Sequence, residues 1–257
     1  MKILGVKIDN LLLNEILDKV ERFLEDNKQH YIVTSNPEFL VKAQKDKEFK
    51  EILNNADLSV PDGVGLIFAS LLSGEKIKQR ITGVDLMEAI CQKAAKKNWP
   101  VFLFGAVDGV AEKAMDNLRG KYEGLEVFII NQLENRSSHS DFFERFTLKG
   151  SDASQKNLNC SLLCKSPSIL FVALGAPKQE KWINENLKKM PNIKLAIGVG
   201  GAFDFISGKV KRAPKCMRLL GLEWFWRLVL QPWRIKRIFN AIIIFPLLVL
   251  KSKLMYN

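Results

Sequence analysis

The stretch Asp57-Leu-Ser-Val-Pro-Asp-Gly-Val-Gly65 carries the pattern around which the rest of the chain is organised. A short apolar run ends in Pro61 and Asp62, and a second apolar run, typical of a helix, follows from Val64 to Leu72. Because Pro61 fixes its own φ and Gly63 permits unusual backbone angles, we expect Asp62 on a rigid turn at the end of a strand. Open α/β sheets bind ligands at such strand ends. An aspartate that only caps the following helix would give the same local pattern.

On both sides of this stretch, strand-like apolar runs alternate with helical apolar stripes. The expected strands cover residues 3–8, 31–34, 57–60, 101–105, 125–130, 169–175 and 194–199. The first helix is expected to follow an N-cap at Asn10. This alternation predicts an α/β fold with a mostly parallel, Rossmann-like sheet and helices on both faces. Residues 131–168 are polar, and we expect a helix near residues 142–146 followed by a mobile loop.

The composition narrows the class of function. The 257 residues carry a net charge of +11, which favours a polyanionic partner such as nucleic acid, an anionic membrane or a phosphorylated substrate. There are four cysteines without a Cys-x-x-Cys pair and only two histidines, far apart, which makes a zinc or thiol-redox site improbable. The N-terminus has neither the apolar core nor the cleavage pattern of a signal peptide.

Polar and glycine-rich segments recur at the ends of the expected strands. They are Thr34 with Asn36, Asp62, Gly105, Gly175–Glu180 and Gly198–Asp204. If the strands are parallel, these segments lie along one edge of the sheet, where glycine turns expose backbone N–H groups to phosphate or sugar oxygens. The set indicates a nucleotide-like ligand, although each glycine taken alone could simply end a strand. The spacing fits neither a dinucleotide-binding fingerprint nor a P-loop.

The C-terminal segment differs in character from residues 1–210, which form the expected α/β domain. Over residues 211–257 basic and aromatic residues interleave, and the almost wholly apolar run Phe239–Leu250 follows. That run is shorter than the roughly 20 residues needed to span a bilayer, so we expect a helical appendage lying in the membrane interface. A core helix or a contact between subunits would also account for it. Arg227, Arg234 and Arg237 would share one face of a continuous helix, unless Pro232 splits that helix.

Seven stretches together resemble one family. They are Thr34-Ser-Asn-Pro-Glu38, Ala56-Asp-Leu-Ser-Val-Pro-Asp-Gly63, Arg80-Ile-Thr-Gly-Val-Asp-Leu86, Leu174-Gly-Ala-Pro-Lys-Gln-Glu180, Gly198-Val-Gly-Gly-Ala-Phe-Asp204, Lys211-Arg-Ala-Pro214 and Leu222-Glu-Trp224. They cover most of the chain in the expected order, and the chain resembles the WecG/TagA/CpsF glycosyltransferases, which assemble bacterial surface polysaccharides. Residues 131–168 depart from the family pattern, because they are longer and more polar than expected there.

The resemblance implies transfer of a sugar from a UDP-sugar to a polyprenyl-diphosphate-linked sugar such as GlcNAc-diphospho-undecaprenol. Such a step belongs to teichoic acid or polysaccharide biosynthesis at the cytoplasmic face of the membrane. It also implies inversion at the sugar carbon, without a metal or another cofactor. Matched by motif, Asp62 is the general base, Thr34, Asn36, Arg80 and Gln179 line the sugar-nucleotide pocket, and Arg227, Arg234 and Arg237 bind diphosphate.

A second class of function remains open at this point. A non-enzymatic module could use the positive charge to dock on a membrane or on nucleic acid. Basic and aromatic residues do suit single-stranded nucleic acid, but the twelve-residue apolar run does not, so no nucleic-acid partner is expected. The donor sugar, the polysaccharide pathway and a homo-oligomeric state are not determined by the sequence.

Overall fold

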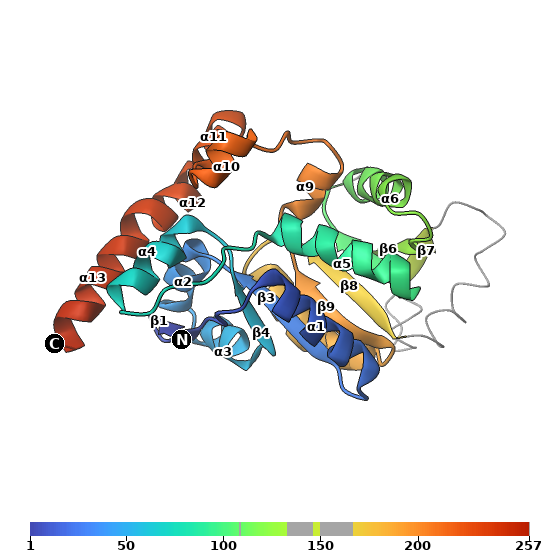
Figure 1. Cartoon of the computed structure of the whole chain (residues 1–257), viewed down its shortest axis with the longest axis horizontal. Helices are drawn as coiled ribbons and strands as arrows, with labels where there is room; N and C mark the ends of the chain where they lie inside the picture. The colour runs from blue at the N-terminus through green and yellow to red at the C-terminus, as the bar shows by residue number, and fades with distance from the viewer. Residues whose placement is uncertain (108, 133–145, 150–166, 257) are drawn as a thin grey trace. The chain divides into compact units, whose positions relative to one another are not determined.

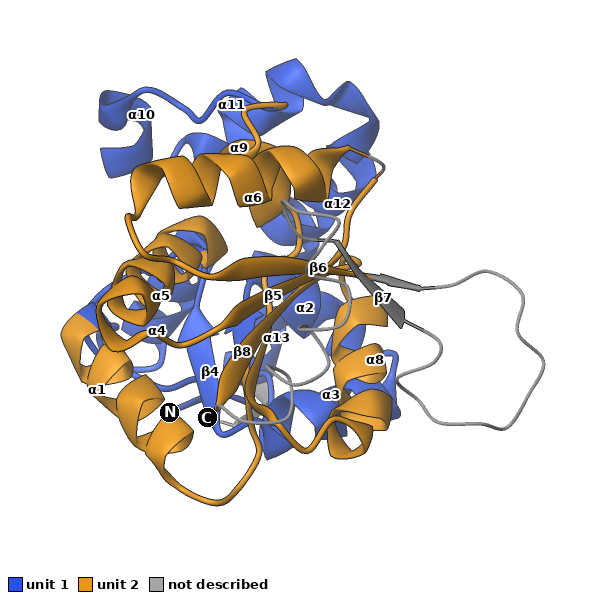
Figure 2. Cartoon of the chain, turned by 90° about the vertical axis from the view of Figure 1, so that its right-hand side faces the viewer, with its two compact units in different colours: residues 1–13, 33–82, 210–257 blue, residues 14–32, 83–209 orange. Residues whose placement is uncertain are grey.

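The computed structural model describes residues 1–107, 109–132, 146–149 and 167–256, and the chain divides into two compact units. Unit 1 comprises residues 1–13, 33–82 and 210–257, and unit 2 comprises residues 14–32 and 83–209 (Figure 2). The division falls within strand β3 (His30–Ser35). The C-terminal segment, expected as a separate appendage, is thus grouped with the two N-terminal segments of unit 1.

Unit 2 is built on a parallel sheet. Strand β8 (Ser168–Ala173) lies between two parallel neighbours, β9 (Ile193–Gly198) and β5 (Val101–Gly105). Strand β6 (Val127–Gln132) pairs in parallel with β5, and β7 (Phe146–Lys149) pairs antiparallel with β6. All six residues of β8 are buried, as expected for a central strand covered on both faces. The α/β class and the parallel sheet expected from the sequence are confirmed.

Helices cover the strands of unit 2 (Figure 1). They are α1 (Leu13–Glu25), α5 (Gly83–Lys97), α6 (Val110–Lys121), α8 (Lys178–Asn186), the 3₁₀ turn η3 (Leu187–Lys189) and α9 (Ala202–Ile206). Alternate side chains of the strands face opposite ways. Phe102 and Phe104 therefore share one apolar cluster with Ile183 of α8, and Trp182 stacks on Phe104 with ring centroids 4.3 Å apart.

Unit 1 begins with a hairpin instead of the single strand expected over residues 3–8. Strands β1 (Lys2–Ile3) and β2 (Val6–Lys7) are antiparallel. The chain reverses at Leu4 and Gly5, whose φ angles are +50° and +76°. Two consecutive residues with positive φ are the requirement of a tight hairpin turn. The leucine gave no sign of this turn in the sequence, because leucine rarely adopts such a conformation.

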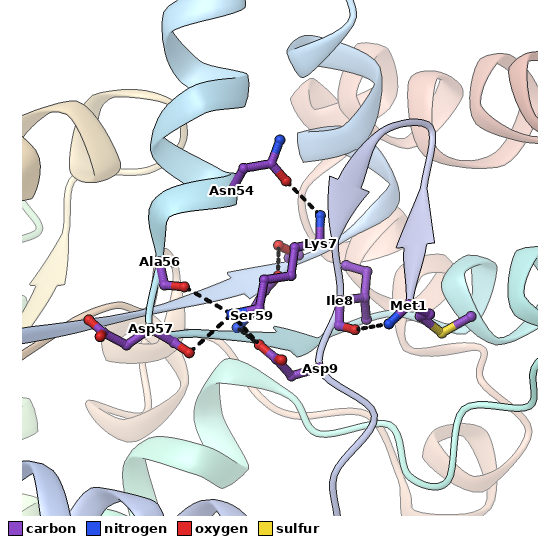
Figure 3. Close-up of polar contacts among 9 residues, drawn as sticks. Met1, Lys7, Ile8, Asp9, Asn54, Ala56, Asp57 and Ser59 are labelled. Carbon is purple, nitrogen blue, oxygen red and sulfur yellow. Dashed lines mark hydrogen bonds and ion pairs between the residues drawn. The ribbon is translucent and has the colours of Figure 1, made fainter.

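The N-terminal segment anchors strand β4 (Leu58–Pro61), which leads to Asp62 (Figure 3). The Asp9 carboxylate accepts a hydrogen bond from the Ser59 backbone N–H at 2.8 Å, and the Asp9 N–H donates to the Ser59 carbonyl at 2.8 Å. Lys7 Nζ donates to the carbonyls of Ala56 and Asp57, each at 3.2 Å. The first half of β4 is thereby fixed before the chain turns at Asp62.

The remaining elements of unit 1 are helical. They are α2 (Pro37–Ala43), α3 (Lys47–Asn55), α4 (Val64–Leu72), α10 (Lys215–Leu219), α11 (Glu223–Leu230), the 3₁₀ turn η4 (Pro232–Arg234), α12 (Ile235–Phe239), the π-helical turn η5 (Asn240–Ile244) and α13 (Phe245–Tyr256). Within the described residues, no helix combines the length and apolar character needed to cross a membrane.

Two prolines shape the C-terminal helices. Helix α11 ends at Leu230, two residues before Pro232, which confirms that this proline splits the helix. Pro246 lies within the apolar run but does not interrupt it, because helix α13 continues through this proline. The wide turn η5 precedes it, and the Phe245 N–H donates to the Asn240 carbonyl five residues back. Such a turn loosens the backbone where a proline ring would otherwise meet a regular helical carbonyl.

Two further expectations need correction. Asn10 does not cap the first helix, which begins at Leu13; its side chain instead bonds the backbone of Lys76 and Lys78 at 2.9 and 2.7 Å. Strand β7 begins at Phe146, within the segment expected to hold a helix and a loop, and an edge of β6 is available for it to pair with. The rest of the predicted helix at residues 142–146 lies outside the described residues.

Candidate active site

Asp62 lies in unit 1 where strand β4 ends, next to the end of β3. Its backbone N–H donates to the Ser35 carbonyl with an N···O distance of 2.7 Å. The hydroxyl oxygen of Ser35 lies 2.8 Å from that of Ser59, three residues before Asp62, in a buried hydrogen bond. The two strand ends are therefore tied together immediately before Asp62, whose side chain is half-buried. This arrangement gives the carboxylate a fixed backbone and access to solvent.

The turn after Asp62 is closely packed against the end of β3. Gly63 has a φ of +112°, and a Cβ at this position would lie only 3.0 Å from the Cδ of Pro37. The position therefore demands glycine, as the sequence suggested. Asn36, on the other side of this contact, caps α2: its Oδ1 accepts from the Phe39 N–H at 3.1 Å. The side-chain NH₂ group is thus the part of Asn36 that can donate to a ligand. Thr34 is buried.

The segment that carries Arg80 runs alongside β4. The Ile81 N–H donates to the Pro61 carbonyl at 3.0 Å, which brings residue 80 close to the strand end. Arg80 Nη2 donates to the carbonyl of Arg218 at 3.1 Å. Two residues along, Arg212 contacts the Thr82 hydroxyl at 3.4 Å, and it lies 3.6 Å from the Glu223 carboxylate. The C-terminal segment is therefore bonded directly to the segment that ends at Thr82.

The three arginines expected on one helix face lie on three separate elements. Arg227 is on α11, Arg234 is in η4 and Arg237 is on α12, because the chain breaks at Pro232. Arg237 Nε forms a 2.8 Å ion pair with Glu38 Oε2 in the first turn of α2. The Glu38 side chain is only 8% exposed, and Lys42 Nζ lies 2.8 Å from its other oxygen. Arg237 is thereby connected to α2, which directly follows the segment that holds Thr34 and Asn36.

Positive charge dominates this part of unit 1. Residues 210–257 contain ten lysines and arginines and a single acidic residue, Glu223. Guanidinium groups pair bidentately with phosphate and are weakly hydrated, so they suit a diphosphate ligand. The carboxylates that the structure places against these arginines, Glu38 and Glu223, offset only part of their charge. The site can therefore offer one carboxylate as a base and several guanidinium groups for anions.

Gln179 belongs to unit 2, whereas the other seven predicted site residues belong to unit 1. Its fully buried side chain ties two glycine turns together at the ends of β8 and β9. Oε1 accepts from the N–H groups of Gly175 and Gly200 at 3.1 and 3.0 Å, and Nε2 donates to Glu180 at 2.7 Å. A Cβ on Gly198 would lie 2.6 Å from Nε2, so only glycine fits there.

The structure adds residues to which the sequence gave no role. Glu38, Arg212 and Arg218 each contact a predicted site residue or its segment. Glu38 and Arg212 occur within the quoted motifs, and Arg218 lies between the last two of them. Their partners in these contacts are distant in sequence, so only the fold could reveal the contacts. Across the described parts of the chain, no three His, Cys, Asp or Glu side chains gather as a metal site would require.

The comparisons with known proteins agree on one family. The model of the glycosyl transferase WecG/TagA/CpsF family matches residues 1–257. An N-acetylglucosaminyldiphosphoundecaprenol N-acetyl-beta-D-mannosaminyltransferase from Bacillus subtilis (strain 168) is 33% identical over 233 residues, covering 90% of this chain and 84% of the relative. A protein of the same name from Staphylococcus aureus (strain MRSA252) is 29% identical over 253 residues, covering 98% of this chain and 92% of the relative.

Proposed function

Because this chain belongs to the WecG/TagA/CpsF family of glycosyl transferases, we propose that it transfers N-acetylmannosamine or a related hexose from a UDP-sugar to GlcNAc-diphospho-undecaprenol. The relatives from Bacillus subtilis and Staphylococcus aureus are named for N-acetylmannosaminyl transfer to that acceptor. Family membership also decides between the two classes left open by the sequence: the chain is a glycosyltransferase and not a non-enzymatic docking module. The product would be an intermediate in teichoic acid or surface polysaccharide biosynthesis.

The observation that carries this proposal is the position of Asp62. The Asp62–Ser35 backbone hydrogen bond of 2.7 Å fixes a half-buried carboxylate at a strand end, in the same unit as the arginine-rich helices. In the proposed step, Asp62 takes the proton of the acceptor hydroxyl as its oxygen bonds to the anomeric carbon. The bond from that carbon to UDP breaks at the opposite face, which inverts the configuration and releases UDP. Arginines stabilise the anionic groups in place of a metal ion.

The remaining residues divide into two roles. Thr34 and Asn36 flank Ser35, whose carbonyl accepts from the Asp62 N–H, and Arg80 precedes Ile81, which bonds Pro61; these positions support a contact with the sugar nucleotide. Arg227, Arg234 and Arg237 would bind diphosphate. Gln179 has both its oxygen and its NH₂ group engaged within unit 2, so we propose that it acts by positioning the two glycine turns, not by touching substrate.

A membrane-bound acceptor requires the enzyme to work at a membrane surface. The C-terminal helices expose large apolar side chains, among them Trp233, Leu247 and Leu254, next to many basic residues. This combination is typical of interfacial helices that bind anionic lipid. We therefore propose peripheral attachment to the cytoplasmic face of the membrane through residues 211–257.

A donor screen tests the proposal most directly. Purified protein is incubated with UDP-N-acetylmannosamine, its uronic acid and UDP-hexoses, with a short-chain prenyl-diphosphate-GlcNAc acceptor and EDTA, and products are identified by mass spectrometry. We expect one donor to give a disaccharide product in the presence of EDTA. Failure of every UDP-sugar would refute the donor class, and loss of turnover in EDTA would refute metal independence.

Asp62→Asn is the matched variant for this assay. It keeps the size and the backbone contacts of the residue but removes the base, so turnover should fall by about 100- to 10,000-fold while the thermal unfolding curve stays the same. Undiminished turnover in a folded Asp62→Asn protein would remove Asp62 from the role of base.

A further inference from the structure

Helix α4, which begins two residues after Asp62, has an unusual surface. Its sequence, VGLIFASLL, contains no charged residue. Leu66, Ala69 and Ser70 are buried, whereas Val64, Phe68 and Leu71 are 41%, 55% and 56% exposed. These three positions are spaced by four and three residues, so they form one stripe along the helix. A helix on the surface of a soluble protein normally places polar residues on its outer stripe.

The stripe lies beside a second exposed apolar surface of the same unit. Helices α4 and α13 pack against each other (Figure 1). Gly65 faces this contact: a Cβ at this position would be in ordinary van der Waals contact, at 3.6 Å, with the ring of the buried Phe245, and would lie only 2.8 Å from the Cγ of Pro37. At the other end, Lys253 Nζ donates to the carbonyl of Leu72 at 2.9 Å. Helix α13 exposes Leu247, Leu250 and Leu254.

We propose that α4 is a second membrane-contacting helix and that, with α13, it forms one surface that docks on an anionic bilayer. This inference rests on the proposed docking of the C-terminal helices and extends it to an element outside them. The excess of basic residues favours lipid over a second copy of the chain. Two copies facing each other would bring ten basic residues and one acidic residue from each C-terminal segment together, whereas anionic headgroups would neutralise them.

The docking of α4 would determine where the chemistry takes place. Only Gly63 separates Asp62 from the first residue of the helix, a chain length of at most about 7 Å between Asp62 and Val64. When the exposed stripe enters the interface, the carboxylate is held at the level of the headgroups. That is the level at which a diphosphate-linked sugar on a polyprenyl chain presents its hydroxyl groups.

Vesicle flotation without any substrate tests this inference. Full-length protein is mixed with vesicles of equal parts phosphatidylglycerol and phosphatidylcholine, and the bound fraction is measured against lipid concentration. The variant F68Q/L71Q should bind the vesicles at least about tenfold more weakly than the wild type, because the two half-exposed side chains no longer move apolar surface from water into the bilayer. The control V107Q removes an exposed apolar side chain from unit 2 and should bind like the wild type.

A second variant separates this inference from the proposal on which it rests. L247Q/L250Q reports on α13 alone. If it weakens binding while F68Q/L71Q binds like the wild type, α4 is not a membrane contact, and the proposed function is unaffected. If neither variant weakens binding, docking through the C-terminal helices fails as well. Sedimentation velocity without lipid measures the oligomeric state and covers the remaining outcome. If the wild type is a dimer that F68Q/L71Q dissociates while vesicle binding is unchanged, the stripe is a contact between two copies of the chain and not a membrane contact. L71Q alone repeats the test if the double variant unfolds.

Discussion

The ion pair between Arg237 and Glu38 allows a substrate contact to be distinguished from a structural one. Removing one partner of a buried ion pair typically costs about 3–5 kcal/mol, because a charge stays buried without compensation. Here Lys42 remains 2.8 Å from Glu38, and the Arg237 side chain is 41% exposed. We therefore expect Arg237→Ala to lower the free energy of unfolding by only about 1–2 kcal/mol. In a chain of this size that corresponds to a fall in Tm of about 2–8 °C.

The double variant R237A/E38Q separates the two roles. Removing the Glu38 charge as well should recover about 1 kcal/mol, because the buried carboxylate that Lys42 alone compensates only in part is then gone. Turnover on the prenyl-diphosphate acceptor should stay low in both R237A and R237A/E38Q if the guanidinium binds diphosphate. Urea unfolding gives the stabilities, and the mass-spectrometric assay gives the turnover. If the double variant regains wild-type turnover together with its stability, Arg237 is a structural residue and its assignment to diphosphate is wrong.

Two further predictions concern unit 2. Gln179→Glu would place a carboxylate against Glu180 in a fully buried position and remove the NH₂ donor. We expect the free energy of unfolding, measured in urea, to fall by about 3 kcal/mol. Lower pH should restore part of this loss, and so should the additional substitution E180Q. An unchanged urea midpoint would show that the tie between the glycine turns is dispensable. Hydrogen bonds from Lys93 and then Lys97 lower the pKa of Glu21 from 4.5 to about 2, so the stability they contribute is complete above pH 4.5 and is lost as the pH falls towards 2. Glu21→Gln should therefore flatten the pH dependence of Tm in that interval, and identical slopes for variant and wild type would contradict this.

The parallel sheet could be predicted because its strands are long apolar runs. Strand β5 was expected at residues 101–105, which are its bounds in the structure. Buried strands of this kind leave little ambiguity, since every side chain must be apolar whichever face it occupies. The hairpin at Leu4 and Gly5 could not be predicted, because a leucine with positive φ is stabilised by the surrounding structure and not by its own preference.

The turn at Asp62 was predictable from the sequence, but the contacts of the predicted site residues were not. Proline, aspartate and glycine in succession indicated the turn at Asp62, and the structure places it at the end of β4. In contrast, the partners of Arg80 and Arg237 are 138 and 199 residues away, so no local pattern could reveal them. The three arginines do not share one helix face, because the helix is broken at Pro232. The direction that the chain takes after this break depends on how the following helices pack.

The wide helical turn at residues 240–244 sets the phase of everything that follows it. A π-helical turn uses about one residue more than a regular turn, which rotates the downstream helix by about 100°. With that extra residue, Phe245 and Val249 point inward while Leu247, Leu250 and Leu254 point outward. Deleting a single residue between 241 and 244 would keep the chain helical but rotate the exposed apolar side chains of α13 away from their present direction. A one-codon change could thus reorient the whole C-terminal helix without altering its composition.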